Sequence, residues 1–75
     1  MALYAEIQKL DEDNQHVRYR YTDVEGVQQT LVLDKEAETI SLETGSEDML
    51  YRAVVRKIAA AWLDGQVPDR MIVHS

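Results

Sequence analysis

The spacing of the hydrophobic residues changes once along this chain, close to residue 45. Before that point, apolar and polar side chains alternate in short runs at 3–8, 16–22, 27–34 and 39–42. Alternation with a period of two is typical of half-buried β-strands. Between residues 46 and 64 the apolar side chains instead recur every three or four positions, which is the spacing of one helical face. The chain is therefore predicted to form strands first and one long helix afterwards.

Short polar segments separate the strand-like runs and predict tight connections between them. These segments are LDEDNQ (10–15), DVEG (23–26) and DKEAE (34–38). Gly26 can adopt the positive φ that ends a hairpin loop. Because connections of this length join neighbouring antiparallel strands, the first four strands are expected to form a meander.

The helix is predicted over residues 46–64, where the sequence holds neither glycine nor proline. Thr44, followed three residues later by Glu47, fits a capping box, and Ser46 is the alternative N-cap. Gly65 then ends the helix as the residue after its C-cap. A helix of this length can lie across one face of the predicted sheet.

The last run, 69–74, is predicted to be a fifth strand with Met71 and Val73 on one side. The returning helix brings this strand back beside the first one, so the preferred strand order is 5-1-2-3-4. The alternative places it parallel to the fourth strand through a right-handed crossover. In both cases residues 1–75 are expected to form a single α+β domain of two layers.

The predicted core combines the inward side of the strands with the apolar face of the helix. Its members are Ile7, Val17, Tyr19, Leu31, Leu33, Ile40, Leu42, Leu50, Val54, Ile58, Trp62 and Met71.

Composition narrows the classes of function. Fourteen acidic residues against eight basic ones give a net charge of −6, which disfavours binding to nucleic-acid phosphates. The charge is uneven, because residues 1–48 hold four basic and twelve acidic groups while residues 49–75 hold four and two. The absence of cysteine excludes disulfides and thiolate metal sites. Since there is neither a membrane-length apolar run nor a signal-peptide pattern, a cytoplasmic protein is expected, without membrane contact.

Residues 16–21, HVRYRY, come closest to a functional motif. Because side chains on a strand alternate between its faces, Arg18 and Arg20 should point away from Tyr19 and Tyr21. Proteins that bind single-stranded nucleic acid need aromatic and basic groups on the same surface. A nucleic-acid binder that uses Arg18 and Arg20 is therefore kept only as the alternative function.

Catalytic and metal-binding motifs find little support in the sequence. The acidic segment 11–14 lacks the central glycine and distal glutamate of a calcium loop, and His16 and His74 have no thiolate to complete a zinc site. Three glycines do not form a phosphate-binding loop, and no serine has the surroundings of a nucleophile. The protein is expected not to be an enzyme and to need no cofactor or metal.

The sheet face away from the helix is the remaining candidate. It is expected to carry Tyr4, Glu6, Gln8, Arg18, Arg20, Gln28, Thr30, Val32, Thr39, Ser41 and Ile72. Tyr4, Arg18, Arg20 and Val32 are predicted to form the centre of a contact with a protein partner or with a second copy in a homodimer. An ordinary solvent-facing surface is the alternative, since antiparallel sheets tolerate one. The predicted function is a small, non-enzymatic interaction or regulatory module.

Overall fold

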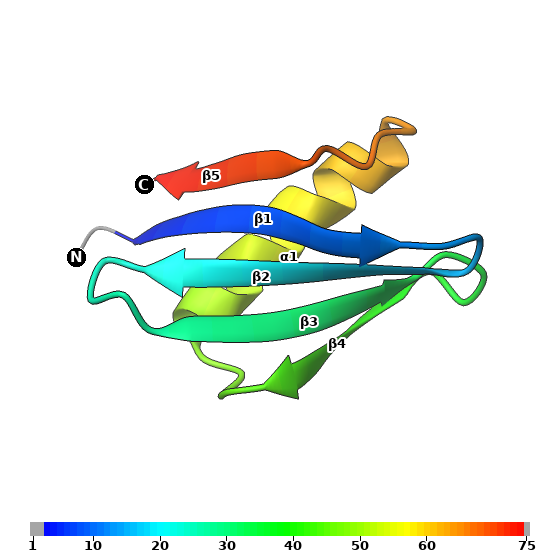
Figure 1. Ribbon diagram of the computed structural model, residues 1–75. Helices are drawn as coiled ribbons and strands as arrows, with labels where there is room; N and C mark the ends of the chain where they lie inside the picture. The colour runs from blue at the N-terminus through cyan, green and yellow to red at the C-terminus, as the bar shows by residue number, and fades with distance from the viewer. Residues whose placement is uncertain (1–2, 75) are drawn as a thin grey trace.

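The computed structural model describes residues 3–74 as one five-stranded sheet and one helix (Figure 1). The elements are β1 (Tyr4–Glu12), β2 (His16–Asp23), β3 (Gln28–Asp34), β4 (Thr39–Thr44), α1 (Met49–Leu63) and β5 (Arg70–His74). All neighbouring strands are antiparallel, and their order is β4-β3-β2-β1-β5. This confirms the predicted α+β meander, and the fifth strand pairs with β1 rather than with β4.

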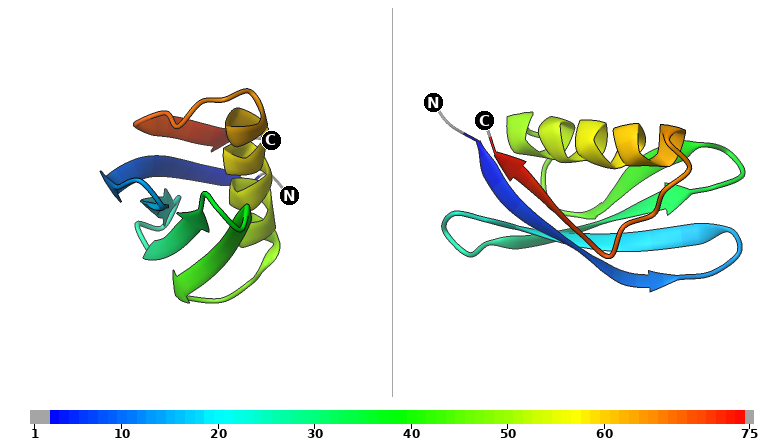
Figure 2. Two further views of the ribbon diagram at one scale, coloured as in Figure 1. Left: turned by 90° about the vertical axis from the view of Figure 1, so that its right-hand side faces the viewer. Right: turned by 90° about the horizontal axis from the view of Figure 1, so that it is seen from above.

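Helix α1 lies diagonally across one face of the twisted sheet, so the molecule has two layers (Figure 2). The buried residues are Ala5, Ile7, Val17, Tyr19, Tyr21, Leu31, Leu33, Tyr51, Val54, Ile58 and Val73. They come from the alternate strand positions that face α1 and from the helical positions that face the sheet, as the two periodicities predict.

The structure confirms the central residues of the predicted core as buried. Five other predicted core residues pack against the buried cluster but remain partly exposed: Ile40, Leu42, Leu50, Trp62 and Met71. Ile40 and Leu42 belong to the edge strand β4, where neighbours are missing on one side. Tyr21, in contrast, is 1% exposed although the predicted core omits it.

The two buried tyrosines of β2 keep their hydroxyl groups hydrogen-bonded. Tyr19 donates to the backbone oxygen of Pro68 at 2.9 Å, and Tyr21 donates to Gln29 Oε1 at 2.9 Å. Burial raises the pKa of each phenol to about 12. Both rings can therefore fill the core without leaving a buried polar atom unpaired.

The helix begins three residues later than predicted. Asp48 is its N-cap, and the Asp48 carboxylate accepts a hydrogen bond from the Tyr51 N–H at 2.9 Å. Thr44 instead ends β4, where its hydroxyl lies 3.1 Å from that of Thr30. The C-terminus agrees with the prediction, because Gly65 has a φ of 76° and donates to Trp62 O.

A cluster of charged side chains connects the C-terminal end of β1 with the β3–β4 turn and with the segment just before β5. The Glu12 carboxylate contacts Lys9 Nζ at 2.8 Å and Lys35 Nζ at 2.6 Å, and Lys9 also contacts Asp69 at 3.0 Å. Hydrogen bonds to Glu12 and then to Asp69 raise the pKa of Lys9 to about 12. The hydrogen bonds from Lys35 and Lys9 lower the pKa of Glu12.

Replacing Glu12 by glutamine should make the stability of the fold less dependent on pH. Because the pKa of Glu12 is lower in the folded chain, its contribution is present above the unfolded pKa and lost as the pH falls through the folded value. We expect Glu12→Gln to lower the urea midpoint at pH 7 and to flatten its decline between about pH 5 and pH 3. Glu25→Gln, in the exposed β2–β3 turn, is the control, and its urea midpoint should follow that of the wild type at every pH. Equal acid sensitivity of Glu12→Gln and wild type would contradict this role.

Candidate interaction surface on the open face of the sheet

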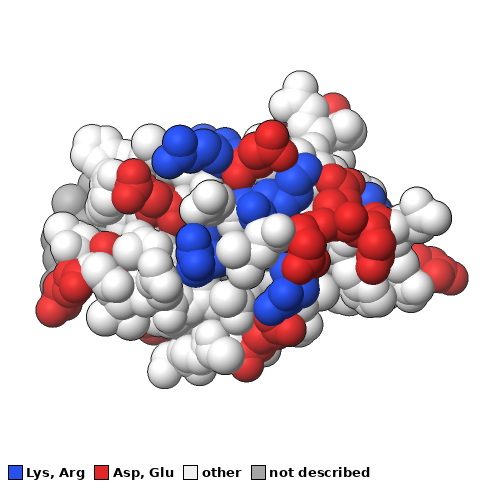
Figure 3. Space-filling model, viewed as in Figure 1, with Lys and Arg blue, Asp and Glu red and all other residues white. Residues whose placement is uncertain are grey.

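The face of the sheet away from α1, called the open face here, is built from alternate residues of all five strands. These residues are Tyr4, Glu6, Gln8, Arg18, Arg20, Thr22, Gln28, Thr30, Val32, Thr39, Ser41, Arg70, Ile72 and His74. Every residue predicted for this face therefore lies on it. Figure 3 shows that acidic side chains crowd the right-hand end of the face, near the β1–β2 and β3–β4 turns, while basic side chains lie mid-face and along the upper edge.

Arg18 is already paired within the chain. Its Nη1 contacts Asp11 Oδ2 at 2.9 Å, and its Nε contacts Glu43 Oε1 at 3.2 Å. A register shift in β1 between Lys9 and Asp11 places Asp11 opposite Arg18. Hydrogen bonds to Asp11 and then to Glu43 raise the pKa of the guanidinium further. The charge of Arg18 is thus largely balanced by its neighbours.

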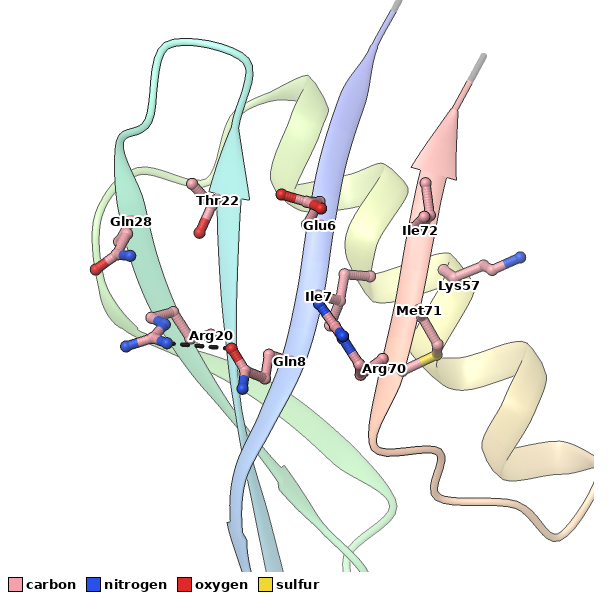
Figure 4. Close-up of a pocket in the computed structure, with 10 residues that line it drawn as sticks. All are labelled: Glu6, Ile7, Gln8, Arg20, Thr22, Gln28, Lys57, Arg70, Met71 and Ile72. Atoms are coloured by element: carbon pink, nitrogen blue, oxygen red, sulfur yellow. Dashed lines mark hydrogen bonds between the residues drawn. The ribbon is translucent and has the colours of Figure 1, made fainter.

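Arg20 differs from Arg18 in its partners. Its Nη2 donates to Gln8 Oε1 at 3.2 Å, and within residues 3–74 it has no carboxylate partner (Figure 4). Arg20 lines an open hollow that extends across β1 to β5. The open-face residues around this hollow are Glu6, Gln8, Thr22, Gln28, Arg70 and Ile72. On the open face the hollow therefore combines two cationic heads, Arg20 and Arg70, with one carboxylate, two amides, a hydroxyl and an exposed aliphatic side chain.

The four residues predicted as the contact centre do not form one cluster. Val32 lies directly opposite Arg18 in the β2–β3 register. Tyr4 instead lies opposite His74, with the two rings edge to face and their centroids 6.2 Å apart. Since Gln8 is the residue opposite Arg20, Tyr4 stands about 13 Å further along β1. The predicted proximity of Tyr4 to the arginines is corrected by this register.

Sequence reasoning placed Ile72 of β5 on this surface but missed the rest of that strand's contribution. Arg70 was not included, although alternation from Met71 and Val73 places it on the open face beside Ile72. Lys57 lines the same hollow from α1, and no sequence pattern indicates that the helix crosses the sheet at that point.

The two histidines, which are the candidate metal ligands, lie far from each other in the fold. His16 is near Asp13 and Asp34, at 3.9 and 3.7 Å, and His74 lies at the opposite end of the sheet beside β1. Among residues 3–74, no group of three or more His, Asp or Glu side chains could hold a metal ion. The Asp13 carboxylate is used by the turn itself, where it accepts from the backbone N–H groups of residues 15 and 16.

Comparison with protein families, curated proteins and solved structures gives no match for this chain. In the part of the chain that the structure describes, no helix is long and apolar enough to cross a membrane. Any functional argument for this protein therefore depends on its own surface.

Proposed function

We propose that this protein is a small, non-enzymatic interaction module that contacts a protein partner through the open face around Arg20. The observation that carries the proposal is the difference between the two arginines of β2. Arg18 is held between two carboxylates, whereas Arg20 has an amide as its partner and borders a hollow. Arginine can pair carboxylates bidentately while its stem covers apolar surface, which suits it to protein contacts.

The neighbours of Arg20 support a protein contact. Ile72 is 54% exposed on the same face, and the amides of Gln8 and Gln28 can both donate and accept hydrogen bonds. Arg70 adds a second cationic head that has no carboxylate partner within residues 3–74. A partner with acidic groups and some apolar surface, either another protein or a second copy of this chain, would fit this arrangement.

Nucleic-acid binding through Arg18 and Arg20 is the alternative function. Phosphate groups would have to compete with Asp11 and Glu43 for Arg18, in a chain whose net charge is −6. A titration with single-stranded and duplex DNA and RNA at low salt tests this alternative. Tight binding that weakens steeply as salt rises would favour it over a protein contact.

Arg20→Glu is expected to abolish the proposed contact and leave the fold intact. The residue lies on the solvent side of β2, and its substitution removes one hydrogen bond with Gln8. Arg52→Glu is the matched control, because it makes the same change of charge on the outer side of α1. Tagged wild type and both variants are used for co-purification from the native host, and light scattering measures self-association.

The expected result is a partner, or a dimeric mass, that wild type and Arg52→Glu share and Arg20→Glu loses. Equal recovery in all three proteins, together with an unchanged monomeric mass, would leave the open face as ordinary solvent surface. Arg18 is not chosen for this test because its substitution would break two ion pairs and could disturb the fold.

A further inference from the structure

Strand β5 forms one edge of the sheet, and half of its backbone groups point outward. The Lys9 N–H donates to Asp69 O at 2.8 Å, immediately before β5 begins. Backbone groups alternate in direction along an antiparallel strand, so those of Met71 and Val73 point to β1. The N–H and C=O groups of Arg70, Ile72 and His74 therefore point away from the sheet. Such an edge can pair with a further strand.

The side chains that flank this edge are basic on both of its faces. Arg70 lies on the open face, and Figure 4 shows Lys57 reaching from α1 past the outer side of β5. Neither has a carboxylate partner within residues 3–74, whereas Lys9, Arg18 and Lys35 all have one. Arg20, Arg52 and Arg56 also lack one within these residues, but Arg70 and Lys57 are the two that stand beside an unpaired strand.

Apolar surface also flanks the edge on both faces. Ile72 is 54% exposed on the open face. On the other face, a hollow between α1 and β5 is lined partly by Ala53, Ala60 and Val73. A strand laid along β5 would direct alternate side chains to these two faces, and each face offers both apolar and cationic contacts.

We propose that the free edge of β5 binds an extended, acidic segment of a partner protein as a sixth strand of the sheet. Backbone hydrogen bonds to Arg70, Ile72 and His74 would hold the segment, and its carboxylates would pair with the Arg70 and Lys57 heads. This proposal depends on the interaction role proposed above, but it does not depend on Arg20.

A second copy of this chain fits the edge less well. Antiparallel pairing of two β5 strands about Ile72 would place Arg70 of each copy next to His74 of the other and would gather both Lys57 side chains nearby. Basic residues at an edge are a known protection against self-pairing. The same residues attract an acidic strand.

Amide hydrogen exchange with two synthetic peptides tests the proposal. One seven-residue peptide alternates glutamate with valine, and the other alternates lysine with valine. The glutamate peptide is expected to slow exchange at Arg70, Ile72 and His74 by about tenfold when nine tenths of the protein is bound. The Met71 and Val73 amides already face β1 and serve as internal references. The lysine peptide should protect none of the three.

Single variants separate the edge from the open face. Lys57→Glu should weaken binding of the glutamate peptide by about fivefold to tenfold, since it replaces an attraction by a repulsion. Arg52→Glu, another exposed position of α1, should not change it, and neither should Arg20→Glu. Loss of peptide binding in Arg20→Glu alone would assign binding to the open face and overturn the edge proposal while leaving the proposed function standing.

Other results would also overturn it. No protection at the three amides with millimolar glutamate peptide would mean that the edge does not accept an acidic strand. Equal protection by the lysine peptide would remove the argument from charge. Protection that rises with protein concentration in the absence of peptide would identify a second copy as the occupant.

Discussion

Replacing Ile58 by alanine is expected to destabilise the fold by about 2–5 kcal/mol. Ile58 is 2% exposed and lies in the middle of α1, where it faces the sheet. The substitution removes buried methyl groups and leaves a cavity that the surrounding core fills incompletely. A domain of 75 residues has a total stability of roughly 4–11 kcal/mol, so much of it would be lost. Urea unfolding followed by far-UV circular dichroism measures the effect.

Leu63→Ala provides the matched control for this prediction. Leu63 is in the same helix and is 80% exposed, so its truncation should change the stability by less than about 0.5 kcal/mol. Alanine is a better helix former than either isoleucine or leucine, so a loss of stability at position 58 alone reports its burial. A midpoint for Ile58→Ala that matches that of Leu63→Ala would mean that α1 faces the sheet with another side.

The topology could be predicted because local signals agree along the whole chain. The polar segments at 10–15, 23–26 and 34–38 are too short for anything but hairpins, so β1 to β4 have to form a meander. With four antiparallel strands and one returning helix, β5 runs in a direction that allows either antiparallel pairing with β1 or parallel pairing with β4, and the structure shows the first. Periodicity and loop length thus determine the meander, while the edge that β5 joins depends on how the helix crosses the sheet.

The start of the helix could not be predicted because it depends on tertiary contacts. Thr44, Ser46 and Asp48 are all acceptable N-caps, and local sequence does not choose between them. Thr44 is recruited by β4, where its hydroxyl accepts a hydrogen bond from the Thr30 N–H at 3.2 Å. This leaves Asp48 to cap the helix. The choice depends on the pairing of β3 with β4.

For the candidate surface, the sequence predicted which side chains lie on the open face better than it predicted which of them are neighbours. Alternation correctly placed Arg18 and Arg20 on the open face. Counting residues back from the β1–β2 turn, where Glu12 pairs with Val17, would place Lys9 rather than Gln8 opposite Arg20. The register shift between Lys9 and Asp11, which sets the β1 neighbours of the two arginines, has no signal in the sequence.

Replacing Gly45 by alanine is expected to destabilise the fold by roughly 2–4 kcal/mol. Gly45 connects β4 to α1 with a φ of 112°, a conformation that residues with a Cβ rarely adopt. A Cβ there would also overlap the side-chain amide of Gln29. Gln29 Oε1 accepts hydrogen bonds from the Tyr21 hydroxyl at 2.9 Å and from the Ser46 N–H at 3.3 Å. Displacing the amide would therefore add the loss of these bonds to the backbone strain.

A double-mutant cycle separates the two causes. Gly26→Ala, at a φ of 83° with open space around the new Cβ, measures strain with no collision and should cost about 1–2 kcal/mol. If the Gln29 amide matters, Gly45→Ala should cost less in a Gln29→Ala background than in wild type, by about 0.5–3 kcal/mol. Urea midpoints of the four proteins give this coupling. An equal cost in both backgrounds would show that backbone strain alone limits position 45, and that Gln29 is free to move away from the new methyl group.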